Sequence, residues 1–191
     1  MIEQSGTPES DDLVVRSPSD VAERSLALLA AIDHAHKRPE QAQSYRPLPA
    51  RFCAHLSEAE AAFLATPAPS EHDRVQFSWR AEALVSLLWA LGHIPSLYPL
   101  NRQADLRSIA VIQAALASPD SFVACAALRP TSVLQEAEDD LYQHHWRVRD
   151  AQLFGKPMPS DLDPEVVFER RYGLSWLVGW GDTWDDVPTD T

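Results

Sequence analysis

Two charged side chains interrupt a strongly apolar segment between residues 79 and 91. Arg80 and Glu82 stand there among tryptophan, alanine, valine and leucine residues. A buried charge without a partner is very costly, so each of these groups needs an opposite charge nearby. Further candidates for a shared polar site or network follow later in the chain. They are Arg149, Asp150, Glu169, Arg170, Asp185 and Asp186.

The simplest pairing joins three helices in one charged network. We expect Arg80 to pair with Glu169, and Glu82 to pair with either Arg149 or Arg170. Such a cluster can be a structural network, or it can serve catalysis or ligand binding. The catalytic version requires one carboxyl group with a raised pKa beside a cleft.

Sequence signatures of known enzyme classes are missing. The chain has no glycine-rich phosphate loop and no H-E-x-x-H motif, and the segment from Gly173 to Leu177 lacks the second glycine of a nucleophile elbow. The C-terminal aspartates do not follow the spacing of a calcium-binding loop. Asp140 and His144 share a helix face and are either a metal-ligand pair or an exposed acid–imidazole pair. The sequence therefore predicts no cofactor and no metal site.

Helix signals recur along the chain, whereas no segment alternates like a strand. Ser17-Pro18 begins a helix, Ser57 and Glu60 form a capping box, and Gly92 ends the apolar helix. The predicted helices cover residues 18–36, 58–64, 79–91, 102–117, 119–128, 131–154 and 165–178. The helix over 79–91 is apolar on all sides and is expected at the centre of the fold. We predict an all-α fold, with a disordered acidic tail over 1–16 and one compact domain over 17–191.

The net charge of −12 is concentrated at the two ends of the chain. Residues 1–20 carry −4, residues 21–130 are neutral, and residues 131–191 carry thirteen acidic and five basic residues. Nucleic acid is disfavoured as a partner because no basic surface is present, while a basic protein is compatible. The longest strongly apolar stretch, 83–91, is too short to cross a bilayer, so no membrane partner is expected.

The compartment is inferred from the cysteines and the first residues of the chain. Cys53 and Cys125 lack any redox or zinc spacing, and Cys125, inside an apolar run, is predicted to be buried. The first twelve residues have no basic start followed by an apolar run, as a signal peptide would. We therefore expect a cytoplasmic protein.

Several of these segments together resemble an uncharacterised bacterial family, domain of unknown function 4272. The resemblance covers roughly residues 17–191, and it implies a helical fold without a known activity. The family pattern often has histidine where Arg171 stands and asparagine where Ser175 stands. The matching segments are Phe77–Leu84, Leu88–Gly92, Leu128–Pro130, Asp140–Tyr142, His145–Asp150, Val167–Tyr172, Trp184–Val187 and Thr189–Thr191.

Two functions remain open from the sequence. The first is a non-enzymatic protein-binding module, in one form a protein that neutralises a basic partner. The second is an enzyme or a protein that binds a small ligand or metal through the Arg/Glu/Asp cluster. An enzyme predicts a concave pocket with the charged cluster at its floor, whereas a binding module predicts a flat or convex acidic surface.

Overall fold

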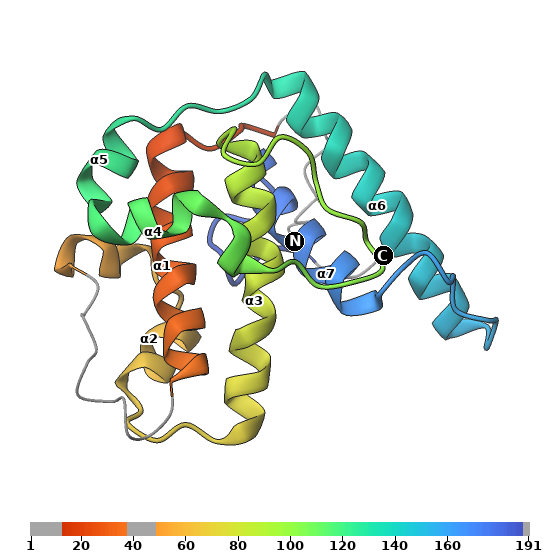
Figure 1. Cartoon of the computed structure of the whole chain (residues 1–191). Coiled ribbons are helices and arrows are strands. Elements are labelled where there is room, and N and C mark those ends of the chain that lie inside the picture. The colour runs from red at the N-terminus through yellow and green to blue at the C-terminus, as the bar shows by residue number, and fades with distance from the viewer. Residues whose placement is uncertain (1–12, 38–48, 189–191) are drawn as a thin grey trace, which may run out of the picture.

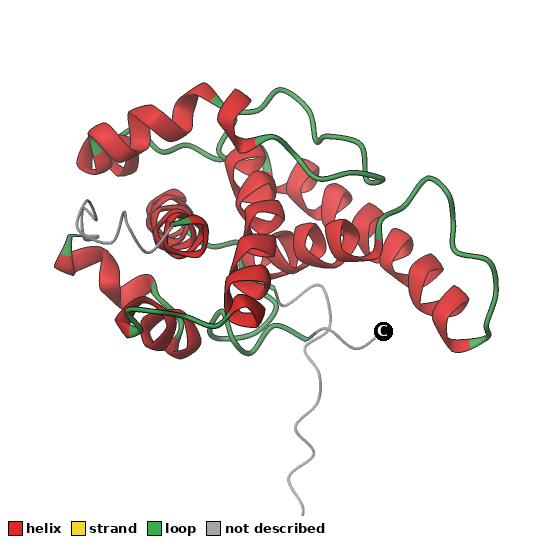
Figure 2. Cartoon of the chain, turned by 60° about the horizontal axis from the view of Figure 1, so that its bottom comes forward, coloured by secondary structure: helices red, strands yellow, loops and turns green. Residues whose placement is uncertain are grey.

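The fold is built from α-helices, as the sequence predicts. The computed structural model describes residues 13–37 and 49–188, and these ranges contain no strand (Figures 1 and 2). None of the helices in these ranges is both long and apolar enough to span a membrane. The elements are α1 (Pro18–His36), η3 (Ala50–His55), α2 (Glu58–Ala65), α3 (Glu71–Ala90), η4 (Leu106–Ser108), α4 (Ala110–Ala117), α5 (Pro119–Ala124), α6 (Thr131–Leu153) and α7 (Pro164–Val178).

Helix α3 lies at the centre, which confirms the prediction for the segment 79–91. It packs against α1 and against α7, and every residue from Glu82 to Ala90 is buried. A helix enclosed on two sides needs apolar residues all round, as the sequence has here. The predicted start was wrong by two turns. The helix begins at Glu71, because the Ser70 hydroxyl accepts a hydrogen bond from the Asp73 amide at 3.1 Å and caps the earlier end.

The other helix boundaries follow the caps where a cap is strong. Ser17 and Asp163 cap the N-termini of α1 and α7, and both halves of the capping box of α2 are formed. The predicted helix over 102–117 is wrong in its first half. There Asp105 accepts a hydrogen bond from the amide of Arg107 and closes a short 3-10 turn, so α4 starts only at Ala110.

Helix α5 and the N-terminal tail also differ from the sequence expectations. Helix α5 ends at Ala124, so Cys125 caps a short surface helix and is exposed instead of buried. Residues 13–16 were expected in the disordered tail, but they run along the end of α7. The Arg16 amide donates to the Leu177 carbonyl oxygen at 2.9 Å. The remainder of the predicted tail, 1–12, lies outside the described residues.

The close approach of α3 and α7 depends on Gly173. A Cβ atom at this position would lie 2.9 Å from the carbonyl oxygen of Ala83, a distance that side chains do not tolerate. The contact brings the charged residues of α7 against those of α3. A helical glycine normally weakens its own helix, so its value here lies in helix packing.

We predict that Gly173→Ala destabilises the protein. In an open helix this change stabilises by roughly 1 kcal/mol, whereas overpacking a buried contact costs about 1–3 kcal/mol. Urea denaturation followed by circular dichroism measures the free energy of unfolding, with Gln113→Ala on exposed α4 as the control. A variant as stable as the wild type, or more stable, would show that α3 and α7 do not pack this closely.

Candidate functional site

The most deeply buried charged pair joins α3 to α7. Arg170 is fully buried, and its Nε donates to Glu82 Oε2 at 2.9 Å. This confirms Arg170, and not Arg149, as the partner of Glu82. Glu82 also accepts from the Ala104 amide at 2.7 Å, and Arg170 donates to the carbonyl oxygens of Tyr98 and Pro99. The pair therefore fixes the long connection between α3 and α4 as well as the two helices.

The predicted Arg80–Glu169 pair is also present, closer to the surface. Arg80 Nη1 donates to both carboxylate oxygens of Glu169, at 3.1 and 3.2 Å. The Arg80 side chain keeps 24 % of its surface exposed, against 9 % for Glu169. Burial raises the pKa of Glu169, and the opposing effect of Arg80 is not enough to cancel it.

A second buried ion pair was not predicted from the sequence. Arg24 of α1 donates to both carboxylate oxygens of Glu60 in α2, at 2.6 and 2.5 Å, and also to the His55 carbonyl oxygen. Arg24 is almost fully buried although it lies between Val21 and Leu28 on an apolar helix. An arginine inside an apolar helix is a sequence signal for a buried ion pair. Glu60 was not considered as its partner, because the capping box of α2 already explains this glutamate.

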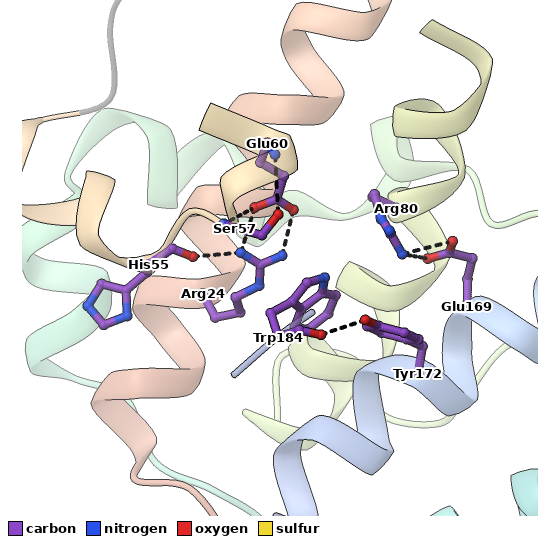
Figure 3. A network of polar contacts seen from close by, with 8 residues as sticks. All are labelled: Arg24, His55, Ser57, Glu60, Arg80, Glu169, Tyr172 and Trp184. Carbon is purple, nitrogen blue, oxygen red and sulfur yellow. Dashed lines mark hydrogen bonds and ion pairs between the residues drawn. The ribbon is translucent and has the colours of Figure 1, made fainter. Parts of the chain in front are cut away.

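Aromatic rings lie between the Arg24–Glu60 pair and the Arg80–Glu169 pair (Figure 3). The Arg24 guanidinium lies 3.8 Å from the centroid of the Trp184 ring, and Arg80 lies 5.3 Å from that of Tyr172. The Tyr172 hydroxyl donates to the Trp184 carbonyl oxygen at 2.5 Å, and burial raises the pKa of this hydroxyl to about 12. Trp176 packs edge-on against Trp184. These rings fill the core between helices.

Four of the eight predicted site residues lie outside this network. Arg149 donates to Gln152, and Asp150 forms an exposed ion pair with Lys156 at 2.7 Å. Asp185 and Asp186 are exposed at the C-terminal end, where Asp186 accepts from the Thr183 hydroxyl. Arg149 and Asp150 of α6, and Asp185 and Asp186 of the C-terminal segment, therefore take no part in the network, whereas the predicted residues of α3 and α7 meet inside.

A hollow of about 550 Å³ opens between α3, α6 and α7. It brings Glu169 and Arg149 to one cavity wall, although they form no ion pair with each other in the described parts of the chain. A carboxyl group with a raised pKa thus lies beside a cleft. The lining residues are Gln76, Trp79, His145, Val148, Arg149, Gln152, Pro164, Glu165, Phe168 and Glu169.

Buried polar contacts also join α6 to α7. Arg171 Nη1 lies 2.5 Å from His145 Nδ1, and because a guanidinium only donates, this ring nitrogen must accept. Burial, together with Arg171 and Arg149, lowers the pKa of His145 to about 4, so the ring is neutral near pH 7. Ser175 donates to Glu138 at 2.7 Å, and burial raises the pKa of Glu138.

Asp140 and His144, which share a face of α6, lie close to each other in the structure. The two side chains form a partly exposed pair, 3.6 Å apart, at one turn of α6. Among residues 13–37 and 49–188, no group of three or more histidine, cysteine or acidic side chains is arranged to hold a metal ion. The structure shows this pair as an acid–imidazole contact with an exposed carboxylate.

Comparison with protein families gives a match to the Domain of unknown function (DUF4272), over residues 3–187. The chain belongs to this family. No curated protein and no solved structure matches the chain. The family description states no activity, so a function has to be argued from the residues of this chain.

We predict that Glu82→Ala strongly destabilises the protein, because it leaves Arg170 buried without its carboxylate. Breaking a buried pair typically costs about 3–5 kcal/mol in the free energy of unfolding. The double variant Glu82→Leu/Arg170→Met should be more stable than Glu82→Ala, since no charge is left unpaired. Arg147→Ala, which breaks an exposed pair with Asp161, serves as the control with a much smaller effect. Equal effects in the buried and exposed pairs would contradict this account.

A second prediction concerns pH. Between pH 6.5 and about 4 the unfolded chain protonates His145 while the folded protein does not, so stability falls as the pH falls through this window. The loss is about 3 kcal/mol, and it is absent above pH 6.5 and complete below pH 4. It is measured as the difference between wild type and His145→Gln in urea titrations from pH 7 to 4. The raised pKa values of Glu138 and Glu169 act in the opposite direction, but both proteins share them. A constant difference would show that His145 is not held neutral.

Proposed function

We propose that the protein is a protein-binding module that acts through the outer side of α6. The observation that carries this proposal is the distribution of exposed apolar side chains. In the described ranges nine large apolar side chains are exposed, and six of them lie between residues 133 and 158. Clustered exposed aromatic and aliphatic side chains are typical of interaction sites. The six are Val133, Tyr142, Trp146, Leu153, Phe154 and Met158.

Helix α6 presents two parallel rows of side chains. The inner row, buried on the α7 side, consists of Leu134, Glu138, Leu141, His145 and Val148. One residue further along lies the outer row, which consists of Gln135, Asp139, Tyr142, Trp146, Arg149 and Leu153. The outer row has the spacing 4-3-4-3-4, the period with which one helix packs along another. Trp146 is 43 % exposed and Tyr142 37 %. The Arg171 guanidinium lies 4.7 Å from the centroid of the Tyr142 ring, so part of Tyr142 and nearly half of Trp146 are accessible.

The charge of this surface favours a partner with basic groups. The first sixteen residues of α6, 131–146, contain four acidic residues and no lysine or arginine. Three of the four, Glu136, Asp139 and Asp140, are exposed. A partner surface with basic groups beside apolar side chains would match this half of the helix.

The exposed cysteines, which have no disulfide or metal spacing, fit a reducing compartment, and we propose that the module acts in the bacterial cytoplasm.

We predict that a photoreactive benzoylphenylalanine at position 143, beside the outer row, gives one predominant cross-linked product in cells that naturally contain the protein. Trp146→Ala should reduce this product strongly, because a buried aromatic side chain is a frequent hot spot of an interface. The matched control places the same probe at position 113 on exposed α4 and should give no such product.

The cross-linking experiment also needs a control for the folding of the Trp146→Ala variant. Urea unfolding must show that Trp146→Ala is still folded under the conditions of the cross-linking, so that a lost product reports a lost contact. A product that forms equally from position 113, or that is insensitive to Trp146→Ala, would overturn the proposal.

The hollow beside Glu169 supports a second candidate function, the binding of a small ligand. The supporting observation is a raised carboxyl pKa at the wall of a cavity that Trp79 and Phe168 also line. A fragment screen by protein-observed NMR tests it. Binding would shift the signals of Gln76, Gln152 and the Trp79 indole, and Glu169→Gln would weaken it. Shifts confined to other surfaces would count against this candidate.

A further inference from the structure

The outer row of α6 has the same spacing in both directions around its centre. Tyr142 and Trp146 lie two residues either side of position 144, Asp139 and Arg149 lie five residues either side, and Gln135 and Leu153 nine. An aromatic residue is thus matched by an aromatic residue, and the acid by a base. Such a row can face a copy of itself when the copy runs antiparallel.

We infer that this protein forms a symmetric homodimer in which the outer rows of two α6 helices pack antiparallel. The inference rests on the proposed function, and it names the partner as a second copy of this chain. In a twofold interface each contact occurs twice, because residue i meets residue j and j meets i. Tyr142 then packs on Trp146 of the second copy, and Asp139 pairs with Arg149 of the second copy, each of them twice.

Charge selects the antiparallel direction. In a parallel pair Asp139 would face Asp139, and Arg149 would face Arg149, and like charges across an interface are unfavourable. In the antiparallel pair Asp139 of each copy faces Arg149 of the other, so opposite charges meet at both places. Arg149 lies at the edge of the hollow beside Glu169 and can take this role, since among residues 13–37 and 49–188 it forms no ion pair and donates only to the amide oxygen of Gln152. Arg149 of the second copy is thus a basic group that faces the acidic half of α6.

Two more of the exposed apolar residues fit the same arrangement. Phe154 and Met158 follow the end of α6. In an antiparallel pair the end of one helix meets the beginning of the other, so these two side chains lie at both edges of the interface. Val133 lies about 160° round the helix from the outer row and takes no part in it.

The shape of the molecule leaves room for a second copy. The C-terminal part of α6 and the loop after it extend away from the other helices in both views (Figures 1 and 2). Among the described elements α6 packs chiefly against α7, on its inner row. A helix of 23 residues is about 35 Å long. The outer row can therefore meet another helix over most of this length.

Sedimentation equilibrium of the full chain tests the inference by charge reversal and rescue. The wild type should dimerise with a micromolar dissociation constant, as expected for an interface at the small end of the range. Asp139→Arg alone, and Arg149→Asp alone, should each weaken dimerisation at least about tenfold. The double variant Asp139→Arg/Arg149→Asp should recover it, because the opposite charges face each other again.

The matched control is Asp140→Arg, one residue away on the same helix but outside the outer row. It makes the same change in net charge as Asp139→Arg and should leave the dimer intact. Urea unfolding of each variant shows that the chain still folds. A wild type that stays monomeric, or a double variant no better than the single ones, overturns the homodimer. If the probe at position 143 then still cross-links a different protein, the proposed binding function stands and only its partner changes.

Discussion

The pairing of Arg170 with Glu82 is the constraint on which the rest of the structure depends. A fully buried guanidinium is tolerable only if its charge is paired. Here the Glu82 carboxylate supplies the opposite charge and accepts from Nε, while two carbonyl oxygens accept from Nη1. Meeting that requirement holds α7 against α3 and fixes the connection that leads to α4. Gly173 then allows the two helices to approach closely. The Arg80–Glu169 pair lies nearer the surface on the same two helices, and its carboxylate forms part of a cavity wall.

The sequence predicted those parts of the molecule that are determined by local chemistry or by a strict burial requirement. The helix starts predicted after Ser17 and Ser57 are confirmed, because a side chain that satisfies free amide groups acts within one turn. Charges inside an apolar helix predicted the two ion pairs of α3. Arg24–Glu60 was missed because Glu60 satisfies a cap and a distant arginine at once. The exposure of Cys125 depends on where α5 lies in the fold, and an apolar run alone does not reveal that.

Helix α6 shows how one helix serves both the fold and a partner. Its inner row buries Glu138 and His145 against α7, where burial keeps the imidazole neutral and raises the carboxyl pKa. Its outer row, shifted by one residue, carries two exposed aromatic side chains between an acid and a base. The predicted site residues divide in the same way. Those on α3 and α7 meet inside and hold the fold, whereas Arg149 lies on the surface that we propose as the interface.

Isotope-filtered NMR on a mixed sample tests the central claim most directly. Half of the molecules carry ¹³C and ¹⁵N and half carry neither, so that a filtered nuclear Overhauser spectrum reports only contacts between different copies. The account predicts cross-peaks between the ring protons of Tyr142 in one copy and those of Trp146 in the other. Intermolecular cross-peaks from Trp146 to residues outside α6 and the loop that follows it, or none at concentrations where the protein is dimeric, would contradict it.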